Sequence, residues 1–176
     1  MAPLSQSGLD ELTARIMKQL SETNYACSFL TRLTNGTTNF VFRGILSQPL
    51  PPPFSSQDHS QGHPVETVII KHTASFVALN KDLPINISLC VVEASILNLL
   101  NDFPDTTFSV KIPHLYLFDE NTNTQVLEDI PGGVDSKTAP VSPTANVVLS
   151  RSLTTSISYA LGAWLRSFHS WTSARS

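Results

Sequence analysis

The sequence predicts an α+β protein with an antiparallel five-stranded sheet and separate helices. Two β-hairpin patterns, at residues 27–46 and 112–127, each enclose a polar turn, and a further strand pattern lies between them at 67–72. Three other segments repeat apolar residues at helical spacing, before, between and after the strand patterns. Strands and helices should therefore occupy separate stretches of the chain.

Composition limits the functional classes. The chain has 176 residues, 41% hydrophobic and 14% charged, which is enough for a packed core. A net charge of -3 without a basic stripe argues against a nucleic-acid partner. The N-terminus lacks the features of a signal peptide, and no apolar run reaches about 18 residues, so we predict a cytoplasmic protein without a membrane partner. Cys27 and Cys90 should be reduced thiols of the core.

The first segment, residues 1–24, is expected to hold a helix over residues 8–20 that is capped by Ser7. Strands follow at 27–33 and 40–46, joined by a polar turn that carries one glycine. Asn-Gly is a common hairpin turn in any β-protein, so the turn alone indicates no function.

Residues 48–64 contain five of the 12 prolines and are expected to form an exposed, partly polyproline insertion between two strands. Residues 49–52 match the P-x-x-P form of an SH3 ligand, a match that is common by chance. His59 and His63 stand four residues apart, but no further ligands lie beside them, which disfavours a metal site.

The strand at 67–72 contains three consecutive apolar residues before Lys71 and should be buried on both faces. A long helix follows, with apolar residues at alternating steps of four and three: Ile85, Leu89, Val92, Ile96, Leu99 and Phe103. The second hairpin comprises strands at 112–118 and 124–127 around the turn 119–123.

Residues 134–150 lack periodicity and are interpreted as a linker. Residues 151–176 then carry a second strong amphipathic helix, with apolar residues at Leu153, Ile157, Leu161, Trp164, Leu165 and Phe168. We expect Trp164 and Phe168 to be core residues and His169 to be a packing histidine.

Lys71 and Glu93 are the most informative pair. Glu93 follows Leu89 and precedes Ile96 and Leu100 on one helical row, a position where an apolar side chain would face the sheet. A buried carboxylate without a partner is costly, so a cation should lie nearby, and Lys71 is the natural candidate. Alternatively, Lys71 extends to the strand edge and Glu93 lies on a solvated flank of the helix.

The order of these elements is that of a kinase N-terminal lobe: a glycine-bearing hairpin, a strand ending in lysine, a helix with a glutamate, and a hairpin ending in an acidic segment. The chain resembles the aminoglycoside phosphotransferase and choline kinase-like family, notably its fungal members, over roughly residues 25–171. The stretches that carry this resemblance are LTNGTTNFVFRGIL, VIIKH, VVEASILNLL, QVLEDIPGG and ALGAWLRSFHSW.

The resemblance implies a protein-kinase-like N-terminal lobe over residues 25–133 and, from residue 151, the first helix of a C-terminal lobe. It also implies an ATP-dependent small-molecule phosphotransferase that uses Mg²⁺. Backbone N–H groups of the first turn would cover the phosphates, Lys71 would bind them with Glu93 as its partner, and the segment after the last strand would bind adenine through its backbone. The implied nucleotide-binding residues are Asn35, Gly36, Thr37, Thr38, Asn39, Lys71, Glu93, Glu128, Asp129 and Ile130. The side chains of Glu128 and Asp129 are expected to be solvated.

The family's catalytic segment, which resembles His-Gly-Asp-x-x-x-x-Asn, and its later metal-binding aspartate are not found in this sequence. We therefore predict a C-terminally truncated chain with neither catalytic residues nor metal ligands, and with little activity alone. The alternatives are a non-catalytic remnant that at most binds nucleotide or a partner protein, and a small interaction module that uses the proline-rich insertion. The phosphoryl acceptor and the oligomeric state stay open.

Overall fold

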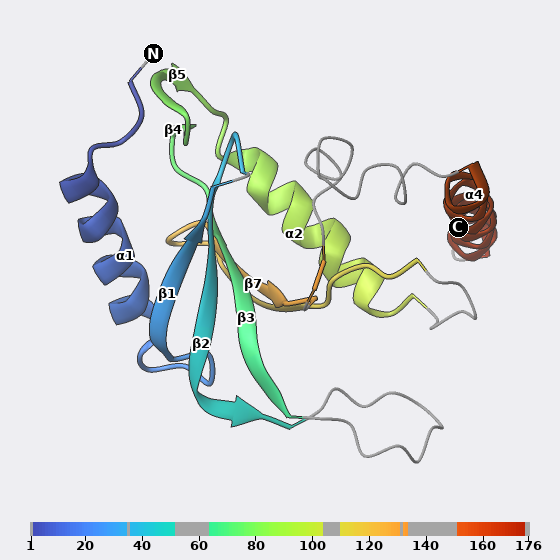
Figure 1. The fold of residues 1–176 in the computed structure, drawn as a ribbon, viewed down its shortest axis with the longest axis horizontal. Helices are drawn as coiled ribbons and strands as arrows, with labels where there is room; N and C mark the ends of the chain where they lie inside the picture. The colour runs from blue at the N-terminus through green and yellow to red at the C-terminus, as the bar shows by residue number, and fades with distance from the viewer. Residues whose placement is uncertain are drawn as a thin grey trace. The chain divides into compact units, whose positions relative to one another are not determined.

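The computed structural model describes residues 2–34, 36–51, 64–103, 110–130, 132–133 and 151–174. These residues form an α+β structure with a five-stranded antiparallel sheet, a two-stranded sheet and three helices (Figure 1). The predicted α+β class and the five-stranded sheet are confirmed, whereas the kinase-like lobe stays a prediction.

The large sheet has the strand order β1-β2-β3-β7-β6, and all neighbours in it are antiparallel. A small hairpin of β4 and β5, which the sequence did not predict, follows β3. The elements are α1 (Gln6–Leu20), β1 (Cys27–Leu33), β2 (Phe40–Leu50), β3 (Val65–His72), β4 (Phe76–Val77), β5 (Asn80–Pro84), α2 (Ser88–Asn101), β6 (Leu115–Asp119), β7 (Thr124–Glu128) and α4 (Arg151–Ser173).

The chain divides into two compact units, the first formed by residues 1–96 and 114–129 and the second by residues 97–113 and 130–176. The first unit contains α1, both sheets and most of α2. The predicted linker 134–150 lies outside the described residues, as does most of the predicted proline-rich insertion, residues 52–63.

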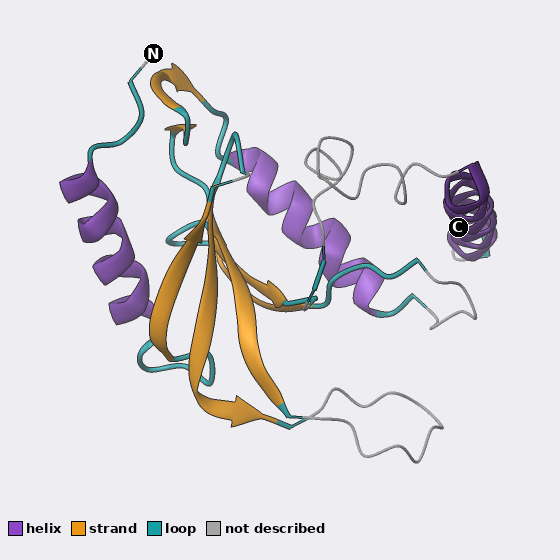
Figure 2. Cartoon of the chain, in the orientation of Figure 1, coloured by secondary structure: helices purple, strands orange, loops and turns teal. Residues whose placement is uncertain are grey.

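Helix α1 covers one face of the large sheet (Figure 2). Its apolar residues Leu12, Ile16 and Leu20 are buried in one cluster with sheet residues such as Phe42 and Ile70. Alternate residues of a strand point to opposite faces, so the residues of β3 between these buried positions face away from α1. This alternation gives the sheet a closed face and a more open face.

Several predicted boundaries shift. Ser5, not Ser7, caps α1, because the Ser5 hydroxyl accepts a hydrogen bond from the backbone N–H of Gly8. Strand β2 continues to Leu50, within the predicted insertion, and pairs there with Val65 after a register shift. Ile69 is only half-buried, so the prediction that its strand is buried on both faces was wrong: the face opposite α1 is less covered.

Helix α2 differs from its predicted orientation. Its buried residues are Cys90 and Ala94. The row that was predicted to define its apolar side is largely exposed to solvent, with exposed fractions of 62% for Leu89, 55% for Val92 and 51% for Ile96. The apolar repeat located the helix correctly but indicated the wrong face toward the sheet.

In the second unit, the Phe103 ring packs edge-on against Trp164, Phe168 and Trp171 of α4. Trp164 and Phe168 are half-buried. His169 is exposed, although its ring packs against that of Phe168 with 6.1 Å between the centroids. Other apolar residues predicted on this helix are exposed: Leu153, Ile157, Leu161 and Leu165. No described helix combines the length and apolarity needed to span a membrane.

Candidate functional site

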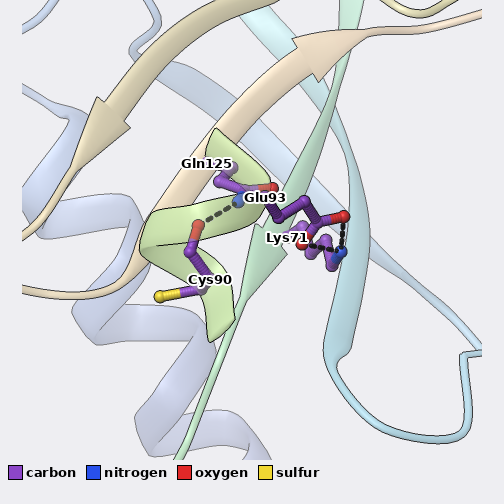
Figure 3. Close-up of polar contacts among 4 residues, drawn as sticks. All are labelled: Lys71, Cys90, Glu93 and Gln125. Carbon is purple, nitrogen blue, oxygen red and sulfur yellow. Dashed lines mark hydrogen bonds and ion pairs between the residues drawn. The ribbon is translucent and has the colours of Figure 1, made fainter. Parts of the chain in front are cut away.

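The contact predicted between Lys71 and Glu93 is present (Figure 3). The Lys71 ammonium donates to both carboxylate oxygens of Glu93, with 2.5 Å between Nζ and Oε2. The side chains are 17% and 41% exposed, respectively, so the pair lies at the edge of the covered surface. An ion pair this exposed adds about 1 kcal/mol or less to stability.

Strand alternation places Lys71 opposite the core. Its neighbours Ile70 and His72 are buried on the α1 face, so Lys71 projects from the other face. Glu93 reaches it from α2 because it lies beside the two buried residues of this helix, Cys90 and Ala94, and the Cys90 carbonyl contacts Gln125 of β7. The pairing was thus predicted correctly, although the row used to argue for it is mostly exposed.

Three apolar residues share the face of the sheet with Lys71. In the ladders, Val41 lies opposite Lys71, and Leu127 lies opposite Ile69, which is two residues before Lys71 on β3. Val41 and Ile69 are half-buried and Leu127 is 9% exposed. Such a partly open apolar surface beside a cation suits a flat ring that carries an anionic group. Strand alternation with Lys71 identifies Ile69 in the sequence, whereas Val41 and Leu127 can be identified only from the strand register.

The first hairpin turn, residues 36–39, is anchored by its carbonyl groups. Thr37 and Thr38 accept hydrogen bonds from the backbone N–H groups of Leu79 and Ala78, at 3.3 and 3.0 Å. Among the described residues, the N–H groups of residues 36–39 donate to no acceptor. A Cβ on Gly36 would lie 3.0 Å from the Asn39 carbonyl, so the turn favours glycine. Asn35, also predicted for this site, lies outside the described residues.

The acidic segment after β7 differs from its prediction. The Asp129 side chain is only 4% exposed. Its carboxylate accepts hydrogen bonds from Arg43 Nη2 at 3.0 Å and from Thr67 Oγ1 at 2.8 Å. Glu128 Oε2 accepts from the backbone N–H of His114 at 3.1 Å. The expected solvated side chains are therefore engaged, and they fix the end of β7 to neighbouring segments.

Ile130, the last residue of the predicted adenine-binding segment, is 49% exposed. Its carbonyl accepts from Gly133 N at 3.2 Å, and Gly132 has a φ of 74°, so the chain turns directly after this segment. Ile130 belongs to the second unit, whereas Glu128 and Asp129 belong to the first.

The side-chain contact of Gln125 was missed by the sequence interpretation, which considered only the backbone of residues 125–130. It lies opposite Lys71 in the β3–β7 ladder and is 1% exposed. Its Nε2 donates to the carbonyl of Cys90 in α2 at 3.2 Å, and its Oε1 has no hydrogen-bond partner among the described residues. A polar residue in a strand gives no periodic signal, and only the register to Lys71 could have identified it.

The described residues contain no group of three or more His, Cys, Asp or Glu that could hold a metal ion. His59 and His63 lie outside that part of the chain. Cys27 and Cys90 are both buried and free, as predicted, and burial raises the pKa of the Cys27 thiol to about 11. The described part of the site thus combines a cation, a partly open apolar surface and the backbone N–H groups of the first turn.

Comparison with known proteins gives one informative similarity. No protein-family profile matches the chain. It is 31% identical over 180 residues to the phosphotransferase FrzJ of Cladobotryum sp., an alignment that covers 95% of this chain and 44% of that protein. The chain thus spans less than half the length of the relative. Over nearly its whole length, it is similar to part of a protein named as a phosphotransferase.

Proposed function

We propose that this chain is the nucleotide-binding lobe of an ATP-dependent, kinase-like phosphotransferase of the aminoglycoside phosphotransferase and choline kinase-like type. The observation that carries the proposal is the ion pair of Lys71 and Glu93 on the open face of the sheet. A strand lysine held by a helix glutamate is the arrangement that presents an ammonium to nucleotide phosphates in kinase folds. The similarity to a phosphotransferase supports the same conclusion.

In this proposal each part of the site has one task. Lys71 offsets the charge of the phosphates, and Glu93 keeps its ammonium in place. The apolar surface of Val41, Ile69 and Leu127 packs against the adenine ring. Backbone groups of residues 128 and 129 bind the ring edge, and N–H groups of residues 36–39 bind phosphate oxygens. When bound with ATP, Mg²⁺ would neutralise further phosphate charge. The described residues hold no group of three or more His, Cys, Asp or Glu, so we propose that its protein ligands come from other parts of the protein.

Titration calorimetry of the purified chain with ATP tests the proposal. Binding is expected, and Lys71→Met should weaken it at least about tenfold, because a tenfold change corresponds to the loss of about 1.4 kcal/mol of charge interaction. Lys81→Met is the matched control, since Lys81 is an exposed lysine of β5. Equal affinity of the wild type and Lys71→Met, or no ATP binding at all, would contradict the proposal.

A second candidate is a protein-interaction module without catalysis. The exposed apolar residues of α2, among them Leu89 and Val92, favour it. ATP binding that depends on Lys71 would favour the phosphotransferase lobe, whereas absence of binding would favour the module.

In either case we expect the chain alone to transfer no phosphoryl group at kinase rates, because metal and substrate alignment supply most of the catalysis. The predicted cytoplasmic location can be tested by fractionating cells that express the chain.

A further inference from the structure

Few side chains of α2 are buried against the sheet. Only Cys90 and Ala94 among its described residues are buried, and both are small. The large residues Leu89, Val92 and Ile96 are more than half exposed. Val91, Leu97 and Leu100 are half-buried, so burial of apolar surface, which usually sets the position of a helix, is only partial here. The polar contacts of this helix to the sheet, Gln125 with Cys90 and Lys71 with Glu93, therefore take a larger share in fixing its position.

Gln125 makes one of these contacts at a decisive point. Its amide donates to the Cys90 carbonyl, and Cys90 precedes Glu93 by three residues, so the two lie on the same side of adjacent turns. Lys71 lies directly opposite Gln125 in the ladder. The bond thus joins the strand pair that carries the lysine to the helical turn that carries the glutamate, as Figure 3 shows.

The orientation of the amide follows from its partner. A carbonyl can only accept a hydrogen bond, so the NH₂ group of Gln125 must face Cys90, and the amide oxygen must point elsewhere. That oxygen is buried without a partner among the described residues. An unsatisfied buried acceptor costs about 1–3 kcal/mol, whereas an apolar residue of the same size would avoid this cost. Stability alone therefore does not account for a glutamine here.

We propose that Gln125 is a positioning residue, whose amide holds the Cys90 turn of α2 on the sheet and thereby keeps the Glu93 carboxylate on the Lys71 ammonium. A second, weaker contact joins α2 to the β6–β7 hairpin that carries Gln125: the Cys90 thiol donates to Asn123 Oδ1, with 3.4 Å between Sγ and the oxygen. The functional meaning of this role rests on the proposed nucleotide site. The structural claim itself concerns only the ion pair and can be tested without nucleotide.

Competitive acetylation of the full chain, without nucleotide, measures this role directly. Mass spectrometry gives the labelling rate of Lys71 relative to that of exposed Lys81 in the same molecule. Glu93→Gln, which removes the charged partner, sets the rate expected for a released Lys71. We expect Gln125→Met to raise the Lys71 rate severalfold toward that value, and Gln125→Asn to do the same because its shorter side chain cannot reach Cys90.

Gln19→Met is the matched control. Gln19 also donates its amide to another element, to Asp119 at 2.9 Å, but it does so from α1. Its loss should leave the Lys71 rate unchanged even if the chain becomes less stable, so the comparison separates positioning from general destabilisation. Circular dichroism confirms that each variant is folded. The isosteric Gln125→Met removes the unpaired oxygen as well as the bond, so its stability should change little.

An unchanged Lys71 rate in folded Gln125→Met and Gln125→Asn would overturn the proposal, as would an equal increase in Gln19→Met. Failure of both Gln125 variants to fold would also overturn it, because Gln125 would then act on the whole fold. ATP titration of the same variants is read separately. A raised Lys71 rate without any ATP binding by the wild type would support the positioning role and reject the nucleotide site.

Discussion

Asp129 shows how a single carboxylate can fix the end of a strand. It is nearly inaccessible and accepts from both Arg43 and Thr67. Asp129→Ala would leave these two donors without their acceptor, so we expect the free energy of unfolding to fall by about 1–3 kcal/mol in urea denaturation. Glu66→Ala, which removes an exposed carboxylate from the neighbouring strand β3, should change it by less than about 0.5 kcal/mol. Equal losses would contradict this assignment.

His72 should make stability depend on pH. Burial and the charge of Arg15 lower the pKa of His72 to about 4, compared with about 6.5 in an unfolded chain. The unfolded chain therefore binds the proton more readily, and the contribution of His72, which is complete above pH 6.5, is lost as the pH falls toward 4. The full loss would be about 3 kcal/mol.

The variant His72→Asn isolates this effect in urea denaturation at several pH values. Asparagine does not titrate, and its amide can still form a hydrogen bond with Thr124 Oγ1, which now lies 3.1 Å from His72 Nδ1. Its free energy of unfolding should fall less steeply than that of the wild type between pH 6.5 and 4. Parallel pH curves would show that His72 does not couple protonation to folding.

Single residues were predictable from the sequence only where they broke a pattern. Glu93 interrupts an apolar helix and Lys71 ends an apolar strand, so both could be identified. Gln125 and Asp129 could not, because their burial depends on partners contributed by other elements. The Asp129 side chain was expected to be solvated because it follows the end of a strand. The expectation failed because Arg43, which binds Asp129, belongs to β2, and only the strand order of the folded sheet brings the two residues together.

At the scale of elements, the close packing of β2 depends on Gly44. A Cβ at this position would lie 2.6 Å from Cys27 Sγ and 3.0 Å from Ile70 Cδ1. We expect Gly44→Ala to lower the free energy of unfolding by about 1–3 kcal/mol, because a packed core resists added volume. On α4, an Ala side chain at position 162 would meet nothing within 4 Å. Gly162→Ala should therefore stabilise the helix, by up to about 1 kcal/mol of free energy. A lower free energy of unfolding for Gly44→Ala in urea denaturation, together with a stronger helical circular dichroism signal for Gly162→Ala, would confirm this contrast.

Elements with a strong repeat were located well, and short ones were not. The first hairpin and the long helix were found because their patterns are regular over many residues. The β4–β5 hairpin was missed because β4 has only two residues and β5, Asn80–Pro84, is mainly polar. The face of α2 toward the sheet was also misjudged, since periodicity identifies an apolar side but not what covers it.

For the whole molecule, the exposed apolar residues of α2 predict self-association. Val92 and Ile96 are 55% and 51% exposed and lie on one side of the helix. We expect the sedimentation coefficient of the wild-type chain to rise with concentration, and the rise to be largely abolished in the double variant Val92→Lys, Ile96→Lys. Ser95→Lys with Asn98→Lys adds the same charge at exposed polar positions of the same helix and should preserve the rise. A wild-type chain that stays monomeric at every concentration would refute this prediction.

The anchoring of the first turn to the β4–β5 hairpin also sets the direction of its peptide planes. In a trans peptide the carbonyl and the following N–H point in opposite directions. Because the carbonyls of Thr37 and Thr38 are directed at Leu79 and Ala78, the N–H groups of Thr38 and Asn39 both point away from the β4–β5 hairpin. The small hairpin thus fixes the orientation of two adjacent donors through backbone bonds alone, whatever side chains occupy positions 37 and 38.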